Sequence, residues 1–147
     1  MPTVIQRSAL VMHSAQNMYQ LVKDVLAYPQ YMDGCEGAEI LEQGEGFMVA
    51  ELRLRKGGIS YSFTTRNTLV EDEEIRLALQ TGPFKHLSGV WTFTPLAENA
   101  CKVNLYLEFE ANSKLLAMAA SSLFSGVANN LVSAISQRAD ILYGKTT

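Results

Sequence analysis

The sequence predicts an α+β domain with a curved antiparallel sheet of six to seven strands, two short helices after the first strand and one long C-terminal helix. Three observations support this fold class. Apolar and polar residues alternate along much of the chain, as they do in strands with one buried face. Turn residues separate these segments at short intervals, which favours an antiparallel meander. Residues 115–137 carry no charge, and their apolar residues recur at three- and four-residue steps, which is typical of an amphipathic helix.

The composition fits one ordinary globular domain over residues 1–147. The chain has 147 residues, of which 48% are hydrophobic and 18% are charged, and its formal net charge is -3. This charge argues against a nucleic-acid-binding surface spread over the whole protein and leaves a local basic patch open. Cys35 and Cys101 fit no metal-binding spacing, so we expect two reduced thiols and no metal site, with a disulfide or a redox role as the alternative.

The two ends of the chain predict a cytoplasmic protein. Residues 1–7 already have a strand pattern and lack the long apolar stretch of a signal peptide. The uncharged C-terminal stretch has the length of a membrane span, but eight Ser, Asn and Gln residues interrupt it, most of them on one face.

The first third of the chain predicts one strand followed by two short helices. Thr3 to Met12 alternate like a strand, and Ser14 is a residue type that caps helix N-termini. Met18 to Val25 then provide one apolar helix face. Tyr28 ends this helix because the residue before a proline avoids the helical conformation. Pro29 to Met32 are expected to form another short turn of helix.

Six further strands and the long helix follow. Gly57-Gly58 is a hairpin signal, and Glu71 to Glu73 form another turn. Ser113 is expected to cap the last helix, which runs to about Tyr143 with Gly144 as its stop; its ~30 residues span roughly 45 Å. Because only this helix is large enough to cover the inner face of the sheet, we expect a helix-grip fold. The strands are expected at residues 38–43, 47–56, 59–69, 74–80, 87–95 and 103–109.

Several short segments, in this order, resemble one protein family over nearly the whole chain. They are MYQLVKDV at 18–25, YPQY at 28–31, SFTTRN at 62–67, GPFKHL at 82–87, GVWTF at 89–93, CKV at 101–103, FE at 109–110, RA at 138–139 and YG at 143–144. The chain resembles the START-like family, also called polyketide cyclases, and within it the branch of RatA ribosome-association toxins and mitochondrial coenzyme-Q-binding proteins. One departure is Asp33-Gly34-Cys35, where the family has a proline and a tryptophan before its cysteine.

The resemblance implies a helix-grip fold and non-enzymatic binding of a hydrophobic ligand, ubiquinone or another isoprenoid-type lipid, with no other cofactor required. It also implies a role either in respiration or in blocking the joining of the ribosomal subunits through the large subunit. A polyketide cyclase-like enzyme is the alternative. The order of the residues suggests no Ser-His-Asp or Cys-His nucleophile, so we expect a binding protein.

The strand alternation and the last helix supply the candidate pocket residues. A curved sheet and one helix can leave an apolar space for a ligand, although the same residues could equally fill a solid core. Gly89 and Gly126 remove side chains from a strand and a helix, which a close backbone contact or a ligand would explain. The candidates are Tyr61, Phe63, Leu77, Leu79, Phe84, Trp91, Phe93, Leu105, Phe124, Val127 and Leu131, with Leu107 on the same inward face.

Two polar regions have competing interpretations. In the segment from Gly82 to His86, Phe84 could form a lid over the pocket mouth, with Lys85 and His86 meeting a polar headgroup or a phosphate; the alternative is a rigid turn. A second region of basic residues could contact ribosomal RNA or could be a solvated sheet face. Its members are Arg53, Arg55, Lys56 and Arg66.

The uncharged polar face of the last helix is a candidate contact surface, because solvated helix faces usually carry charge. Its expected partners are a second copy of the chain in a homodimer, the ribosome or, through peripheral contact, a membrane. An ordinary solvated face is the alternative. The residues on this face are Ser122, Ser125, Asn129 and Ser133.

Overall fold

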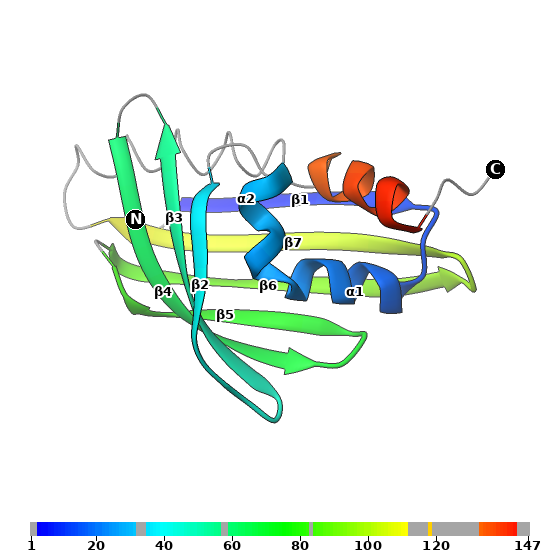
Figure 1. Cartoon of the computed structure of the whole chain (residues 1–147), viewed down its shortest axis with the longest axis horizontal. Helices are drawn as coiled ribbons and strands as arrows, with labels where there is room; N and C mark the ends of the chain where they lie inside the picture. The colour runs from blue at the N-terminus through cyan, green and yellow to red at the C-terminus, as the bar shows by residue number, and fades with distance from the viewer. Residues whose placement is uncertain are drawn as a thin grey trace.

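One antiparallel sheet of seven strands organises the computed structural model, which describes residues 3–31, 35–56, 59–82, 84–111, 118 and 133–143. The strand order is β1-β7-β6-β5-β4-β3-β2, so each strand from β2 to β7 lies beside its sequence neighbour and β1 closes the far edge (Figure 1). The strands are β1 (Thr3–Val11), β2 (Cys35–Gly44), β3 (Phe47–Lys56), β4 (Ile59–Val70), β5 (Glu74–Thr81), β6 (Phe84–Ala97) and β7 (Ala100–Ala111).

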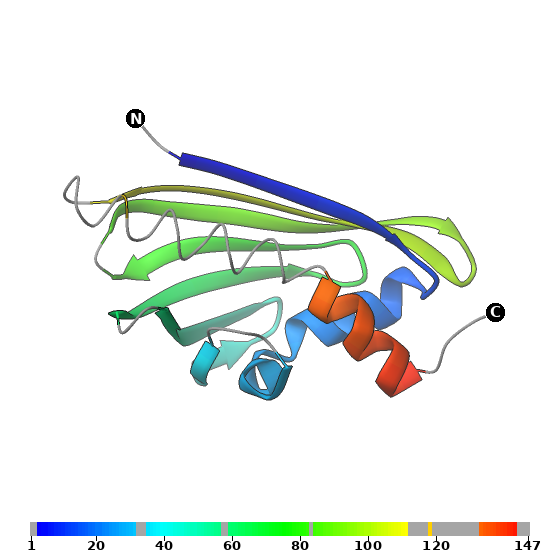
Figure 2. The same cartoon turned by 90° about the horizontal axis from the view of Figure 1, so that it is seen from above.

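The helices gather on the concave side of the sheet. They are α1 (Ala15–Lys23), the 3₁₀ turn η1 (Val25–Ala27), α2 (Tyr28–Tyr31) and a C-terminal helix whose continuously described part is residues 133–143. Figure 2 shows α1 beside the C-terminal helix at one end of the curved sheet. This arrangement confirms the predicted helix-grip architecture.

The first helix begins at its predicted cap. The Ser14 hydroxyl accepts a hydrogen bond from the Asn17 backbone N–H at 3.1 Å and thereby pairs one of the free N–H groups at the helix start. The chain leaves the α-helical conformation after Lys23, and a second helix begins at Tyr28 with Pro29 at its first turn, where proline is tolerated. The first helix thus ends earlier than predicted, and Tyr28 takes the helical conformation (φ -53°, ψ -44°) although it precedes Pro29. The prediction that Tyr28 ends this helix was wrong, whereas the second short helix expected here is confirmed.

The strands follow the predicted alternation, and some extend further than predicted. β3 has the expected bounds, whereas β6 begins at Phe84 and not near Leu87. Phe84 pairs with Ala111 across the sheet, and a register shift separates that pair from His86↔Glu110. The Gly82-Pro83 signal suggested a turn through residue 86, but strand pairing with β7 begins at residue 84.

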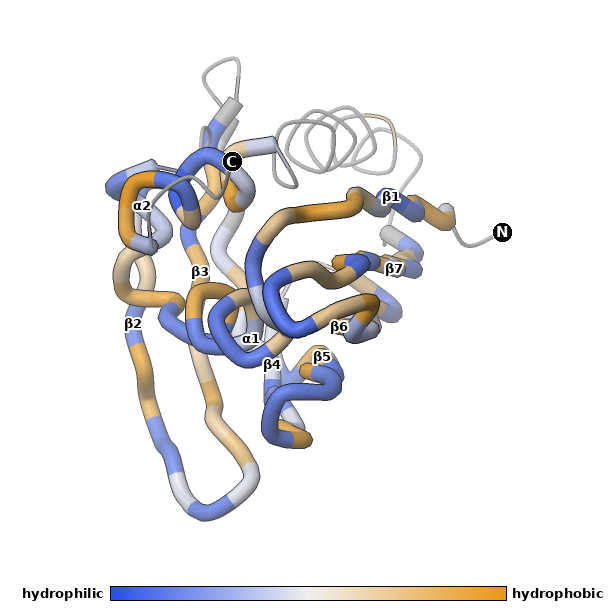
Figure 3. Tube along the Cα trace, turned by 90° about the vertical axis from the view of Figure 1, so that its right-hand side faces the viewer, coloured by the Kyte–Doolittle hydropathy of each residue, from blue (hydrophilic) through white to orange (hydrophobic). Residues whose placement is uncertain are grey.

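The inner face of the sheet forms the core with α1 and the C-terminal helix. Figure 3 shows apolar and polar residues alternating along the strands. Ile135 and Ala139 are 1% and 0% exposed, and His13 Nε2 lies 2.7 Å from Asp140 Oδ1, which fixes the last helix to the turn after β1. Of the predicted contact face, Ser133 is exposed. Ser113, Ser122, Ser125, Gly126, Asn129 and Gly144 lie outside the described residues.

Candidate ligand-binding cavity

A cavity of about 100 Å³ lies between the inner face of the sheet and the helical segment after β1. Its walls come from β3 to β7, and Val22, Val25 and Tyr28 close it on the helical side. Most of the lining side chains are apolar, because the inward positions of these strands carry Leu, Ile, Phe and Trp. The arrangement suits a small apolar group.

The predicted pocket residues divide into three groups. Phe63, Leu77, Trp91 and Leu105 line the cavity, as does Leu107. Phe93 instead packs its ring edge-on against Tyr19 at 6.0 Å between centroids, and Leu79 packs against the core without lining the cavity. The backbone of Tyr61 pairs with Leu54. The side chain of Tyr61, together with Phe124, Val127 and Leu131, lies outside the described residues.

Phe84 lies in an aromatic cluster and not over an opening. Its side chain is 6% exposed, and its ring makes edge contacts with Phe63 at 6.4 Å and Phe109 at 6.0 Å. The lid expectation does not fit this position, because β6 starts at Phe84 and the strand directs this side chain inward. Lys85 and His86 are exposed, and His86 Nε2 lies 3.1 Å from Ser88 Oγ.

Two buried polar residues interrupt the apolar lining. Thr65 and Asn67 are each 4% exposed and both face the cavity from β4. The Thr65 hydroxyl donates to Asn67 Oδ1 at 2.7 Å. Their inward position could be predicted from the alternation in residues 59–69, but the sequence analysis did not single them out.

Tyr28 is a structural residue of the cavity wall. Its hydroxyl donates to the backbone carbonyl of Val22, and its ring packs against Tyr31 at 6.1 Å. Burial raises the pKa of Tyr28 well above its usual value, with smaller contributions from Tyr31, Cys35 and Asp24. The phenol therefore stays protonated at neutral pH.

A wider cleft of about 670 Å³ lies next to the cavity. It runs between α1 and the β2–β3 hairpin and includes charged side chains such as Asp24, Glu45 and Glu71. Lys23 and Met48 line both the cleft and the cavity. These two residues therefore form the boundary between an apolar interior and a polar outer space.

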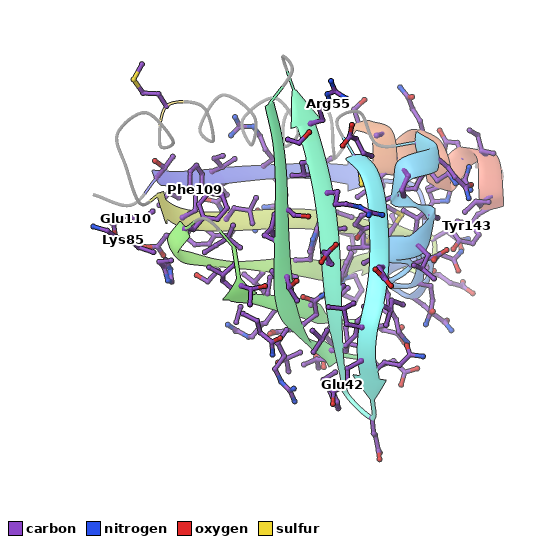
Figure 4. The ribbon with its side chains drawn as sticks, turned by 60° about the vertical axis from the view of Figure 1, so that its left-hand side comes forward. Glu42, Arg55, Lys85, Phe109, Glu110 and Tyr143 are labelled. Atoms are coloured by element: carbon purple, nitrogen blue, oxygen red, sulfur yellow. The ribbon has the colours of Figure 1, made fainter. Side chains whose placement is uncertain are left out.

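The predicted basic residues on β3 and β4 have different local contacts. Arg53 and Arg55 are exposed on β3, and Arg55 Nη1 lies 3.3 Å from Glu36 Oε1. The Arg66 guanidinium stacks 4.1 Å above the Phe47 ring centroid. Figure 4 shows Arg55 and Lys85 at separate corners of the molecule. The side chain of Lys56 lies outside the described residues.

Comparison with known proteins identifies the family. The model of the family described as polyketide cyclase / dehydrase and lipid transport matches residues 11–136. The chain belongs to this family. A relative named ribosome association toxin RatA, from Vibrio cholerae serotype O1, is 48% identical over 141 residues, which cover 96% of this chain and 98% of that protein.

Other proteins are similar to the chain more distantly, in sequence or in fold. The mitochondrial coenzyme Q-binding protein COQ10 homolog B of Xenopus laevis is 26% identical over 136 residues, which cover 90% of this chain and 56% of that protein. The Zhui aromatase/cyclase from Streptomyces sp. R1128 matches with a TM-score of 0.87 at 19% identity, covering 99% of this chain and all of that chain. A START superfamily protein from Mycobacterium smegmatis matches with a TM-score of 0.81 at 22% identity, covering 95% of this chain and 98% of that chain. These likenesses confirm the START-like fold. Within the described residues, no helix has the length and apolar content needed to cross a membrane.

Proposed function

We propose that this protein is a non-enzymatic factor that associates with the ribosome and holds a neutral hydrophobic ligand of quinone or isoprenoid type in its cavity. The observation that carries the ligand-binding part is the cavity itself, which lies between the sheet and the helical segment after β1 and is mainly apolar. The sequence identity with the proteins named for ribosome association supports the other part.

The size of the cavity limits which part of a ligand it can hold. An engineered protein cavity of ~150 Å³ binds benzene, so a cavity of about 100 Å³ suits a single ring or a short length of prenyl chain. A longer ligand would continue past Lys23 and Met48 into the cleft. The name of the Xenopus relative, a coenzyme Q-binding protein, agrees with a ligand of this kind.

The lining of the cavity supports binding and not catalysis. Among its described residues there is no carboxylate, imidazole or thiol that could transfer a proton. Tyr28 is held neutral, and Lys23 lies at the boundary with the cleft. A cyclase-like enzyme remains the alternative because the Zhui protein shares the fold. Turnover of a polyketide substrate by the purified protein would favour that alternative.

Ligand binding can be tested directly because Trp91, the single tryptophan of the chain, lines the cavity. We expect mass spectrometry of natively purified protein to detect a bound isoprenoid. We also expect a ubiquinone with a two-isoprene tail to quench Trp91 fluorescence saturably after lipid removal. Absence of both signals would overturn ligand binding.

Ribosome association would place the protein in the cytoplasm and can be tested separately. Following the family resemblance, we propose that it contacts the large subunit and hinders the joining of the small one. Overexpression should then raise the free subunits at the expense of joined ribosomes in a sucrose gradient. The protein should also sediment with the large subunit. An unchanged profile would contradict this part of the proposal and leave the cavity proposal standing.

A further inference from the structure

We infer that Asn67, oriented by Thr65, donates a hydrogen bond to the carbonyl oxygen of a ligand in the cavity and so selects neutral carbonyl-bearing rings over hydrocarbons of the same shape. This inference rests on the proposed ligand-binding function. It assigns a specificity-determining role to one side chain of the cavity wall.

The position of the pair within the sheet supports this role. Asn67 lies between Met48 of β3 and Leu77 of β5 in the strand register, so both of its lateral neighbours on the inner face are apolar. Thr65 likewise lies between Ala50 and Leu79. The two polar side chains therefore form a small polar spot on an apolar wall.

The hydrogen bond within the pair decides which atoms can meet a ligand. The Asn67 oxygen accepts from the Thr65 hydroxyl at 2.7 Å. The NH₂ group is therefore the end of the amide that can donate to a ligand. Burying an amide is unfavourable unless its polar atoms find partners, and a leucine of nearly the same size would avoid that cost. A ligand oxygen at this wall would satisfy the NH₂ group.

The charges around the cavity indicate a neutral ligand. Among the described lining residues, only Lys23 is charged, and it lies at the boundary with the polar cleft. Among these residues, Lys23 is the one cation that could accompany an anion next to Asn67, and a buried anion without a cation is strongly unfavourable. A quinone or ketone carbonyl accepts a hydrogen bond without carrying charge, so this chemical class fits the wall.

The experiment compares duroquinone with durene, two tetramethyl-substituted six-membered rings of similar shape. Duroquinone has carbonyl groups at the two positions where the aromatic ring of durene has C–H groups. Duroquinone has no unsubstituted ring position to which Cys35 or Cys101 could add. Calorimetric titrations of both ligands into the wild-type protein and into Asn67→Leu form a double-mutant cycle that cancels general hydrophobicity. We expect the substitution to weaken duroquinone binding relative to durene by about five- to tenfold.

Control variants separate this role from a structural one. Thr68→Val lies on the outer face of the same strand and should change neither affinity. Thr65→Val should lower duroquinone affinity in the same direction as Asn67→Leu but less, and it also serves as the test if Asn67→Leu fails to fold. If both ligands bind wild type and neither inner variant changes their ratio, the inference is overturned while ligand binding stands. If neither ligand binds wild type, both the inference and the proposed ligand binding are overturned.

Discussion

On β4, the inner face presents Phe63, Thr65 and Asn67 to the cavity, whereas the outer face presents Ser62, Arg66 and Thr68. Polar residues occur on both faces of this strand, but the energetic cost of a polar side chain differs between the two faces. On the solvated side, a polar residue has little energetic cost and needs no partner in the protein. On the buried side, each polar atom needs a partner, so Asn67 points to a binding event that Arg66 alone does not.

The largest expected difference between the faces is in stability. Phe109→Ala, on the inner face of β7, should lower the free energy of unfolding by ~3–5 kcal/mol because Phe109 is 1% exposed and a cavity would remain. Lys102→Ala, exposed on the same strand, should change it by no more than about 0.5 kcal/mol. Urea unfolding of both variants measures the contrast. If both variants lost the same free energy of unfolding, burial would not explain a difference between the two faces.

Thiol chemistry gives the next contrast. Burial raises the pKa of the Cys101 thiol to about 11. Because the thiolate is the reactive form, Cys101 should react with Ellman's reagent at pH 8 roughly two hundredfold more slowly than an ordinary thiol, from ionisation alone. A cysteine introduced by Thr94→Cys on the exposed outer face of β6 should react at the ordinary rate. Rapid reaction of Cys101 in the folded protein would show that the inner face opens to solvent.

The same pKa shift predicts a pH dependence of stability. The folded thiol ionises at a higher pH than the unfolded thiol, so its stabilising contribution is complete below about pH 9 and is lost as the pH rises to about 11. Unfolding free energies measured across this window should therefore fall more steeply for the wild type than for Cys101→Ala. Parallel curves would contradict the burial of this thiol.

Gly89 tests how closely the inner face is packed beside the cavity. A Cβ atom there would lie 2.7 Å from Leu107 Cδ2 and 2.8 Å from the Tyr106 backbone oxygen. Gly89→Ala should therefore destabilise the protein by ~1–3 kcal/mol, while Ser88→Ala on the other face should have little effect. Thermal unfolding of the two variants is the measurement. An unchanged stability of Gly89→Ala would show that the Leu107 side chain can move into the cavity.

The smallest effect on the fold is expected from charge changes on the outer face. Arg53→Gln with Arg55→Gln should leave stability and Trp91 quenching unchanged. If these side chains meet ribosomal RNA, the change should reduce the slope of log affinity against log salt for ribosome binding by about two. Glu39→Gln, on the neighbouring strand, is the matched control and should not lower the slope. If the slope is the same in the arginine variant and the wild type, the ribosome contact must involve a different surface of the protein.

Much of the fold could be predicted because alternation and turn residues are local signals. The strand β3 has its predicted ends, and Ser14 caps α1 as its residue type indicates. Phe84 was assigned to a loop because Gly82-Pro83 is a turn signal, whereas pairing with Ala111 is a long-range effect that no local pattern shows.

The site was harder to predict than the fold for a related reason. The alternation placed Asn67 on the inner face, but its significance depends on the apolar neighbours Met48 and Leu77, which belong to other strands. The cleft beside α1 likewise forms between Tyr19 and Phe47, which are distant in sequence. Sequence patterns give the orientation of a side chain, while its surroundings require the tertiary structure.

The shared boundary at Lys23 and Met48 has a consequence for ligands that differ in tail length. If the ring of a quinone lies beside Asn67, every isoprene unit beyond this boundary leaves the apolar interior for a half-polar cleft. Affinity should then rise with the first units and level off afterwards. Such a protein would recognise the ring of an isoprenoid quinone and would not distinguish between long tails. Quinones from different organisms, which differ in the number of isoprene units, would then bind with similar affinity.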